Sequence, residues 1–326
     1  MSKNILEVKD LVTSFQTDAG KAVAVDGVSF SVPAGKTLGI VGESGCGKSV
    51  TALSMMRLLP KPSGNIDNGS IMYNGSDITK MVPDELYKIR GNHISMIFQE
   101  PMTALNPVHK IRSQLGETYK LHNREMSKDQ VHQACIEMMT KVGIPSPEAR
   151  LDDYPHQLSG GMRQRVMIAI ALACKPDILI ADEPTTALDV TIQAQILELM
   201  KELQTETGMA IVFITHDLGV IAEICDEVMV MYGGRVAEKA NVLDLFGNPR
   251  HPYTKGLLQS IPRLESPRKK PLATIEGMVP SLFDMPQGCR FQNRCPHAGP
   301  GCEKVQQRLT IKDGHDVYCH KHAEIN

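Results

Sequence analysis

A glycine-rich segment near the start of the chain has the residue types needed to bind phosphate groups. Its sequence is Gly42-Glu43-Ser44-Gly45-Cys46-Gly47-Lys48-Ser49, which fits the pattern G-x-x-x-x-G-K-[ST]. The glycines let the backbone approach phosphate oxygens closely, because no Cβ atom stands in the way. The ammonium group of Lys48 can reach the β- and γ-phosphates of a nucleotide, and the Ser49 hydroxyl can ligate Mg²⁺. A plain glycine-rich turn is the alternative, and the expected strand before the segment and helix after it argue against that.

An acidic pair, Asp182-Glu183, directly follows the apolar run Ile178–Ala181, which is typical of a buried strand. At the end of such a strand the Asp182 carboxylate suits the Mg²⁺ shell of a bound nucleotide. The Glu183 carboxylate suits the polarising of a water molecule for attack. An acidic helix cap before Thr185 is the alternative, and the phosphate-binding segment upstream favours the catalytic interpretation.

Two further polar residues end predicted strands. Gln99 follows the apolar stretch at 94–98, and His216 follows the stretch at 210–215. A carboxamide at Gln99 can reach Mg²⁺ or the attacking water, and an imidazole at His216 can contact the γ-phosphate. A lone glutamine is usually a surface residue and a lone histidine is usually structural, so both assignments depend on position.

The stretch Leu158-Ser159-Gly160-Gly161-Met162-Arg163-Gln164-Arg165 places a hydroxyl and two glycines before a predicted helix over 162–174. Amide groups at a helix N-terminus, together with a serine hydroxyl, form a binding site for an anion. For Ser-Gly-Gly alone, a helix N-cap with a glycine turn would be the preferred interpretation. Ser159 is far along the chain from Lys48, which points to a separate anion site.

These residues need a scaffold of alternating strands and helices, and the hydrophobic pattern supplies one. Short apolar runs are typical of buried parallel strands, whereas apolar positions three or four residues apart are typical of amphipathic helices. Alternating positions in the first forty residues predict antiparallel strands, and Gly233-Gly234 predicts a hairpin turn. A mostly helical block over about 102–174 indicates an inserted subdomain within an α/β fold. The expected parallel strands cover 38–41, 94–98, 178–181 and 210–215, and a helix is expected over 49–59.

Composition excludes several classes of protein. The 326 residues carry a net charge of −2, so the overall charge does not favour binding to nucleic acid. No apolar run reaches the roughly 18 residues that a membrane-spanning helix needs. The N-terminus lacks the apolar core of a secretory signal. We therefore expect a soluble, cytoplasmic protein, and any transport system that it serves would need other chains to form the pore.

Four of the eight cysteines crowd into the last forty residues. Prolines interrupt the chain repeatedly after about residue 246, which predicts a separate, loop-rich extension. In a reducing compartment the crowded thiols favour a metal over disulfides, as Zn²⁺ or an iron–sulfur cluster. The spacing C-x5-C-x6-C-x16-C lacks the paired C-x2-C of zinc ribbons and favours a cluster, with unligated thiols as a further alternative. The cysteines are Cys289, Cys295, Cys302 and Cys319, and zinc stays open because His297, His315 and His320 lie nearby in sequence.

Cys46 lies inside the phosphate-binding segment. Lys48 and the N-terminus of the following helix are expected to favour its thiolate, which would make the segment sensitive to oxidation. A small residue that packing accepts is the preferred interpretation.

The order of the motifs resembles that of the nucleotide-binding domain of ABC transporters. The resemblance covers about residues 1–246 and implies a P-loop NTPase (RecA-like) core with an N-terminal antiparallel β subdomain and an inserted α-helical subdomain. It implies ATP and Mg²⁺ as ligands and a dimer of ATPase subunits. The matching segments are Gly42–Ser49, Gln99, Leu158–Arg165 (the signature segment), Ile178–Glu183, Ala187-Leu188-Asp189 and His216.

Roles follow from this resemblance position by position. It implies that Lys48, Ser49 and Asp182 hold phosphate and Mg²⁺, with Gln99 beside them. It implies that Glu183 is the catalytic base and His216 the switch histidine. Ser159, Gly160 and Gly161 match the part of the signature that closes on the ATP of a partner chain. Asp189 matches a loop that communicates across the dimer, and Phe15 matches an aromatic under adenine, although plain core is the alternative for Phe15.

The extension, residues 247–326, resembles the C-terminal region of ATPase subunits, D type, in oligopeptide and dipeptide importers. The resemblance rests on Asn248–Thr254 and Gly288–Pro296, with support from Tyr154–Gln157 and Phe98–Thr103. It implies a heterodimer with a similar ATPase, two membrane permeases and an external peptide-binding protein, at the cytoplasmic face of the cell membrane. It also implies a [4Fe–4S] cluster at the four cysteines.

Three other functions stay open. An importer ATPase for nickel or another small solute would have a similar sequence. A soluble ABC ATPase acting on nucleic acid or the ribosome is less favoured, because long coiled coils, a second ATPase unit and a basic stripe are missing. Intact Glu183 and His216 argue against a non-catalytic regulatory subunit.

Overall fold

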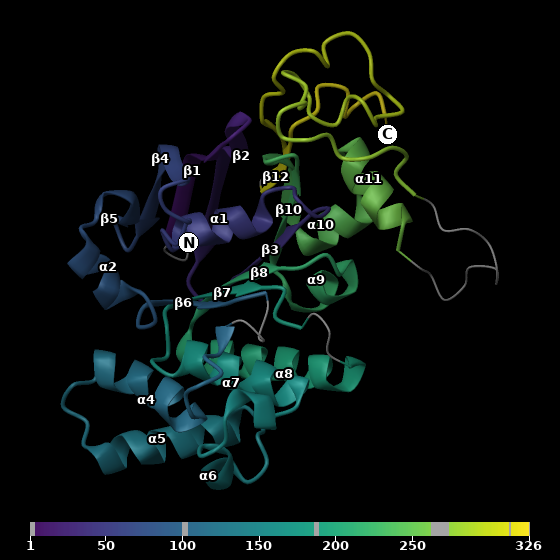
Figure 1. The fold of residues 1–326 in the computed structure, drawn as a ribbon. Helices are drawn as coiled ribbons and strands as arrows, with labels where there is room; N and C mark the ends of the chain where they lie inside the picture. The colour runs from purple at the N-terminus through teal and green to yellow at the C-terminus, as the bar shows by residue number, and fades with distance from the viewer. Residues whose placement is uncertain (1–3, 100–103, 186–188, 262–273, 313, 326) are drawn as a thin grey trace. The chain divides into compact units, whose positions relative to one another are not determined.

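The computed structural model describes residues 4–99, 104–185, 189–261, 274–312 and 314–325 (Figure 1). The chain divides into two compact units. The first unit comprises the described residues within 1–5, 32–36 and 80–213. The second unit comprises those within 6–31, 37–79 and 214–326.

The first unit is built on short strands whose residues are all buried. β6 (Ile94–Ile97) and β7 (Ile178–Asp182) pair in parallel, and β8 (Ala210–Ile214) lies beside β7. Short, mostly apolar buried strands are what the sequence pattern predicted. The carboxyl end of β7 carries Asp182, and the chain leaving β6 carries Gln99.

Helices make up most of the rest of the first unit. α4, α5 and α7 contact one another, and α7 also contacts β6 (Figure 1). The helical pattern predicted after Gln99 is therefore present among the described residues. The bounds are α2 Pro83–Ile89, α4 Ile111–His122, α5 Lys128–Lys141, α6 Pro147–Arg150, α7 Gly160–Leu172 and α8 Val190–Thr207, with a 3₁₀ turn at Pro155–Gln157.

An antiparallel sheet in the second unit has the strand order β2-β1-β4-β5. β1 pairs with β4 from Leu6 opposite Tyr73 to Phe15 opposite Gly64, with a register shift in the middle. This sheet confirms the antiparallel strands predicted at the start of the chain. The bounds are β1 Asn4–Thr17, β2 Gly20–Pro33, β4 Gly64–Tyr73 and β5 Ser76–Asp77, and a 3₁₀ turn follows at Ile78–Lys80.

The other strands of the second unit follow the order β11-β12-β10-β9-β3. β3 pairs in parallel with β9, and β9 forms the predicted hairpin with β10 around Gly233-Gly234. The strand bounds are β3 Thr37–Val41, β9 Glu227–Tyr232, β10 Arg235–Asn241, β11 Leu309–Lys312 and β12 His315–Val317. The helices of this unit are α1 Lys48–Met55, α9 Leu218–Ile224, α10 Val242–Gly247 and α11 Pro252–Gln259.

One prediction about these elements was wrong. α1 ends at Met55 rather than at 59, because Arg57 adopts a left-handed backbone conformation with φ of 49°. The predicted C-terminal extension contributes a strand to the sheet, since β12 pairs with β10 at Glu238 and Lys239. Strands as short as β11 and β12 carry too little alternation to be found in a proline-rich sequence.

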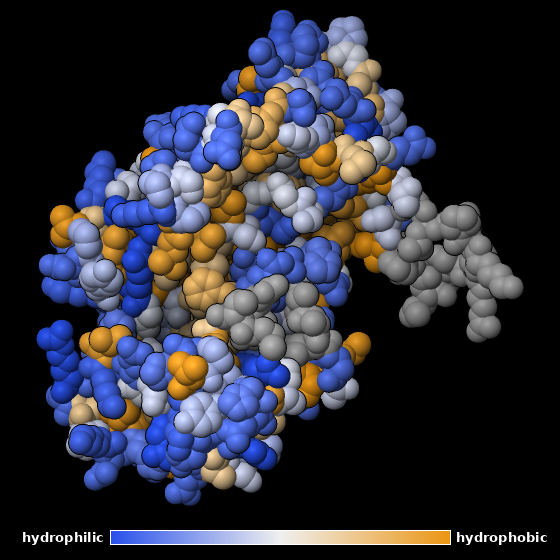
Figure 2. All heavy atoms as spheres, viewed as in Figure 1, coloured by the Kyte–Doolittle hydropathy of each residue, from blue (hydrophilic) through white to orange (hydrophobic). Residues whose placement is uncertain are grey.

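No helix among the described residues is long and apolar enough to cross a membrane. The face drawn in Figure 2 is mostly hydrophilic, with scattered hydrophobic residues between the polar ones.

Candidate active site

The phosphate-binding segment, Gly42–Ser49, connects β3 to α1 in the second unit. Lys48 is buried, and its Nζ donates to the carbonyl oxygens of Gly42, at 2.7 Å, and Glu43, at 3.2 Å. Gly47 has φ of 100°, and a Cβ atom there would lie 2.6 Å from the carbonyl oxygen of Ala24. Glycine is therefore required at position 47 by backbone conformation and by space.

Cys46 is supported by the β9–β10 turn. Its carbonyl oxygen accepts a hydrogen bond from the backbone N–H of Gly234, at 2.9 Å. Its thiol is buried, and burial raises the pKa of Cys46 although Lys48 acts in the opposite direction. The expected thiolate at Cys46 was therefore wrong, because loss of water around the sulfur outweighs the nearby ammonium. The alternative of a small packing residue fits the structure.

The acidic strand end and Gln99 come together in the first unit as the sequence predicted. Asp182 is buried at the end of β7, and Glu183 is partly exposed. The Nε2 of Gln99 donates to Oε2 of Glu183 at 3.3 Å. Glu183 has φ of 49°, an uncommon conformation for a residue with a side chain and one that often accompanies functional sites.

The signature segment begins helix α7. Ser159 is the N-cap, and its Oγ accepts a hydrogen bond from the backbone N–H of Met162 at 3.3 Å. Ser159 and Gly160 are both exposed. Within the part of the chain that the structure describes, a Cβ atom at Gly160 would meet nothing within 4 Å. Contacts among the described residues explain neither the exposure of Ser159 nor the glycine at 160.

One contact of the signature segment was not predicted. The Nε2 of Gln164, a buried residue of α7, donates to the carbonyl oxygen of Pro184. Because Pro184 follows Glu183, this bond ties the signature helix to the acidic strand end within the first unit. The spacing of Gln164 from Ser159 gave no indication of this partner.

The remaining predicted residues lie at the surface or on the small sheet. Asp189 is the N-cap of α8, with its Oδ1 accepting from Ile192 N at 2.9 Å. His216 is exposed just after β8, and Phe15 is partly exposed in β1 opposite Gly64. These positions leave the roles of the three residues as predictions. Ala187-Leu188 and the stretch 100–103 lie outside the described residues.

The four C-terminal cysteines all border one small cavity, together with His297 and His320. Burial first, and then the other three thiols, raise the pKa of Cys289 to about 11. His315 takes no part, because its Nε2 pairs with the buried Glu238 carboxylate at 2.7 Å. Among the described residues, no group of three or more His, Cys, Asp or Glu side chains could hold a metal ion. The thiols converge, but their arrangement does not support the expected cluster or zinc.

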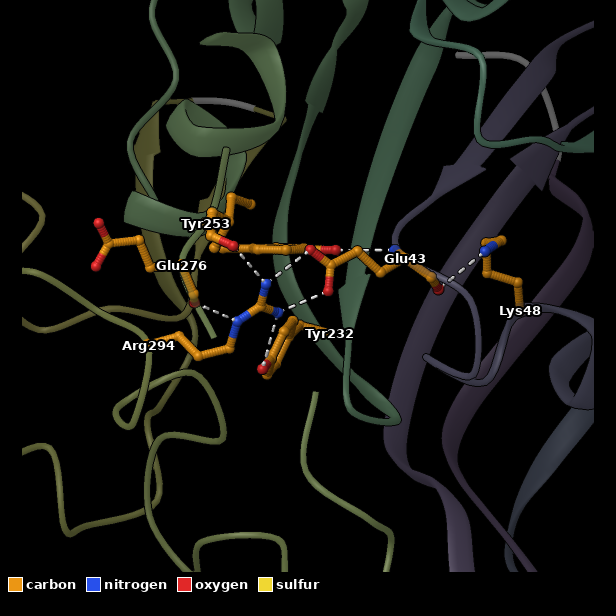
Figure 3. Close-up of polar contacts among 7 residues, drawn as sticks. Glu43, Lys48, Tyr232, Tyr253, Glu276 and Arg294 are labelled. Atoms are coloured by element: carbon orange, nitrogen blue, oxygen red, sulfur yellow. Dashed lines mark hydrogen bonds and ion pairs between the residues drawn. The ribbon is translucent and has the colours of Figure 1, made fainter. Parts of the chain in front are cut away.

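A contact that the motifs did not indicate joins the phosphate-binding segment to the cysteine-rich region (Figure 3). Arg294 forms an ion pair with Glu43, and Tyr253 accepts a hydrogen bond from the backbone N–H of Glu43. Glu43 occupies an unrestricted x position of the motif, so the sequence offered no signal for either partner.

Comparisons with known proteins agree with this site. Residues 25–186 match the family described as ABC transporter, and residues 237–302 match the Oligopeptide/dipeptide transporter, C-terminal region. The dipeptide transport ATP-binding protein DppD of Bacillus subtilis is 52% identical, over 97% of this chain and 94% of that protein. The chain belongs to the ABC transporter ATP-binding proteins. The oligopeptide transport ATP-binding protein AppD of the same species is 50% identical, over 98% of this chain and 97% of that one.

Solved structures of this family share the fold. The ATP-binding cassette MJ0796, in a dimeric post-hydrolysis state bound to ADP and Pi, matches with a TM-score of 0.66 at 27% identity. That match covers 73% of this ABC ATPase and 98% of the other chain. CbiO1 of Clostridium perfringens, part of the cbiONQ transporter complex, matches with a TM-score of 0.63 at 27% identity, over 76% and 92%. The predicted P-loop NTPase fold class is confirmed, and the protein is an ATP-hydrolysing enzyme.

Proposed function

We propose that this ABC ATPase powers the import of di- and oligopeptides, together with membrane permease subunits, from the cytoplasmic face of the membrane. The observation that carries the proposal is the oligopeptide/dipeptide transporter region at 237–302, on the same chain as a full set of ATPase motifs. Residues 1–246 supply the nucleotide chemistry, and residues 247–326 form the importer-type extension.

Each predicted site residue has its own role in hydrolysis. The backbone amides of the phosphate-binding segment and the Lys48 ammonium hold the β- and γ-phosphates. Ser49, Asp182 and Gln99 offer the hard oxygen ligands that suit Mg²⁺, and the bound ion neutralises charge on the phosphates. Glu183 accepts a proton from the attacking water, and the Gln99 amide, which donates to its carboxylate, orients that carboxylate. His216 contacts the γ-phosphate.

The exposed signature segment acts on a partner. Ser159, Gly160 and Gly161 close on the ATP held by a second, homologous ATPase, and Asp189 communicates across that dimer. Ser159 and Gly160 are exposed, which supports a use outside this chain. The assembly is a heterodimer of ATPases with two permeases and an external peptide-binding protein. Phe15 lies under the adenine of the nucleotide that this chain binds.

Reconstitution tests this function. The chain, its partner ATPase and the permeases are assembled in vesicles, and phosphate release is measured with and without peptide-loaded binding protein. Peptide should stimulate turnover, and Glu183→Gln should lower turnover by roughly 10²- to 10⁴-fold with ATP binding retained. Gln99→Ala and His216→Ala should also lower turnover with ATP binding retained. The matched control Glu206→Gln changes an exposed carboxylate and should leave turnover unchanged. Stimulation by another solute, but by no peptide, would contradict peptide import.

We also propose that Cys289, Cys295, Cys302 and Cys319 hold a [4Fe–4S] cluster with a structural role. Four thiols around one cavity offer the residue types that ligate such a cluster, and their side chains would have to rearrange to reach ligand positions. Anaerobic purification should give a brown protein that contains iron and sulfide, and Cys295→Ser should lose both. Zinc in place of iron and sulfide would overturn the proposal.

A further inference from the structure

Glu43, in the second unit, is fixed by hydrogen bonds to its backbone N–H, its carbonyl oxygen and its carboxylate. Its backbone N–H donates to the hydroxyl of Tyr253 at 2.9 Å, and its carbonyl oxygen accepts from Lys48 at 3.2 Å. Its carboxylate accepts two hydrogen bonds from Arg294, at 2.6 and 3.2 Å. Glu43 therefore has its backbone and its side chain anchored at once, and two of the three anchoring residues belong to the C-terminal region (Figure 3).

Arg294 is fully committed to this position. Its side chain is only 6% exposed, and each of its five N–H groups has an acceptor. Besides the two bonds to Glu43, it donates to the hydroxyl of Tyr232 and to the carbonyl oxygens of Ile275 and Glu276. Lysine has three donors on a single nitrogen and cannot reproduce this planar fork. The Arg294 guanidinium thereby joins three separate stretches of chain beside Glu43, at the start of the phosphate-binding segment.

Tyr253 provides a rigid second support. Its side chain is fully buried, and its ring packs edge-on against Tyr232, with ring centroids 4.7 Å apart. Phe291 packs against both tyrosines, at 5.2 and 5.3 Å. An aromatic cluster of this kind leaves the Tyr253 hydroxyl little freedom.

We propose that Arg294, acting through Glu43 and together with Tyr253, is a positioning residue that holds the phosphate-binding segment in its nucleotide-accepting shape. Segments that are already ordered bind ligands more tightly, because less conformational freedom is lost on binding. The C-terminal extension thereby raises the affinity for ATP indirectly, through Glu43, without any of its own residues contacting the nucleotide. The inference rests on the proposed phosphate-binding role of Gly42–Ser49.

The test measures Mg–ATP binding to the full chain by calorimetry, and turnover in the assembled transporter. Arg294→Lys keeps the charge and loses the fork, whereas Glu43→Gln keeps the shape and loses the charge. Each should raise the Kd for ATP on the order of tenfold, the effect of one charge-assisted hydrogen bond. The KM for ATP should rise similarly with little change in kcat, because the lost contact serves ground state and transition state alike.

The double variant separates positioning from general destabilisation. If Arg294 acts through Glu43, the combination should raise the Kd by no more than either substitution alone. The matched control is Arg308→Lys, which makes the same change at a side chain that is 61% exposed in the same region. It should change the Kd by less than about twofold, as is usual for exposed sites.

The measured Kd values test the positioning role of Arg294. An unchanged Kd in either single variant, or additive effects in the double variant, would overturn the inference. If Arg294→Lys does not fold, Glu43→Gln alone decides it by the same criterion. Lys48→Ala is measured in parallel: if it leaves ATP binding intact, the phosphate-binding assignment itself fails. If Lys48→Ala abolishes binding and the Arg294 and Glu43 variants do not weaken it, only the positioning role fails.

Discussion

The phosphate-binding segment and the signature segment differ sharply in how much support they receive from their own chain. Lys48 is 6% exposed and donates to two carbonyl groups, and the neighbouring Glu43 and Cys46 are held by residues far along the sequence. Ser159 and Gly160 are exposed, and among the described residues the Ser159 side chain bonds only to its own helix, at Met162. The first segment is therefore shaped before it meets a ligand, whereas the second presents its functional groups outward.

This difference indicates how the two segments are used. A buried lysine with ordered neighbours suits a nucleotide that the same chain binds, because the binding site needs little rearrangement. Gly160 has no neighbour within 4 Å of the Cβ position among the described residues, so packing inside the chain does not demand a glycine there. The open space at Gly160 is compatible with the dimer contact proposed above.

The largest expected effect is on ATP binding by the isolated chain, which a substitution in the phosphate-binding segment should weaken and one in the signature segment should not. Lys48→Ala in the isolated chain should weaken ATP binding on the order of 100-fold, because a buried charged contact to phosphate is lost. Ser159→Ala should leave that affinity unchanged, since in the proposed dimer Ser159 acts on the nucleotide of the partner. In the assembled transporter both variants should lose turnover. Calorimetry on the chain and phosphate release from the assembly check this, and weak ATP binding by the isolated Ser159 variant would break the comparison.

A smaller effect concerns the support beneath the phosphate-binding segment. His251 is buried next to the aromatic cluster, and its Nδ1 accepts a hydrogen bond from the backbone N–H of Tyr253 at 3.1 Å. Burial lowers the pKa of His251 from 6.5 to about 4, although the Glu238 carboxylate acts in the opposite direction. Between these two values the unfolded chain binds a proton that the folded chain does not. The free energy of unfolding should therefore fall by up to about 3 kcal/mol as the pH drops from 6.5 to 4.

Chemical denaturation across this pH range measures the slope. His251→Asn keeps a side chain that can cap Tyr253 and cannot titrate, so its stability should depend less on pH while staying close to the parent value at pH 7. Glu238 contributes in the same direction at lower pH. Burial alone would raise the pKa of Glu238, but hydrogen bonds from the His315 side chain and from the backbone N–H groups of His251 and Arg250 outweigh burial, so the pKa is lowered. An unchanged pH slope in the Asn variant would contradict the assignment to His251.

The smallest expected effect compares two glycines. Gly47→Ala places a Cβ atom 2.6 Å from a carbonyl oxygen at a left-handed backbone position, and it should lower the free energy of unfolding by roughly 1–3 kcal/mol. Gly160→Ala meets open space at the start of a helix and should leave stability unchanged or raise it by less than about 1 kcal/mol. Thermal unfolding of both variants checks this. Equal destabilisation by both would remove the structural distinction between the two segments.

Much of the candidate site could be predicted because its signals are local. The turn before α1, the acidic residues after β7 and the serine that caps α7 each depend on neighbours a few residues away. Their identities and spacing therefore indicated their structure. The sequence placed Gln99 and Glu183 at strand ends near the same water and Mg²⁺, but their hydrogen bond, between the ends of neighbouring parallel strands, appears only in the structure.

Other features depended on which distant surfaces meet. The burial that raises the pKa of Cys46 comes from packing of the whole unit, and it reverses what the local charges suggested. The pairing of β12 with β10 joins stretches about 80 residues apart, and no alternating pattern in the sequence predicts it. The convergence of four cysteines on one cavity was expected, whereas only the side-chain positions show that, among the described residues, they are not arranged as a metal site in this structure.

The sequence by itself determined the chemistry of this ABC ATPase: a phosphate-binding segment, an acidic strand end and a signature, each a short run of residues. Tertiary structure alone decided that Arg294 meets Glu43 across 251 residues, and that Tyr253 supports the same point. The physical reason is that a guanidinium at any surface site has many possible acceptors. Only the folded arrangement of the loop-rich extension selects one carboxylate, and so connects the C-terminal region to the predicted phosphate-binding segment.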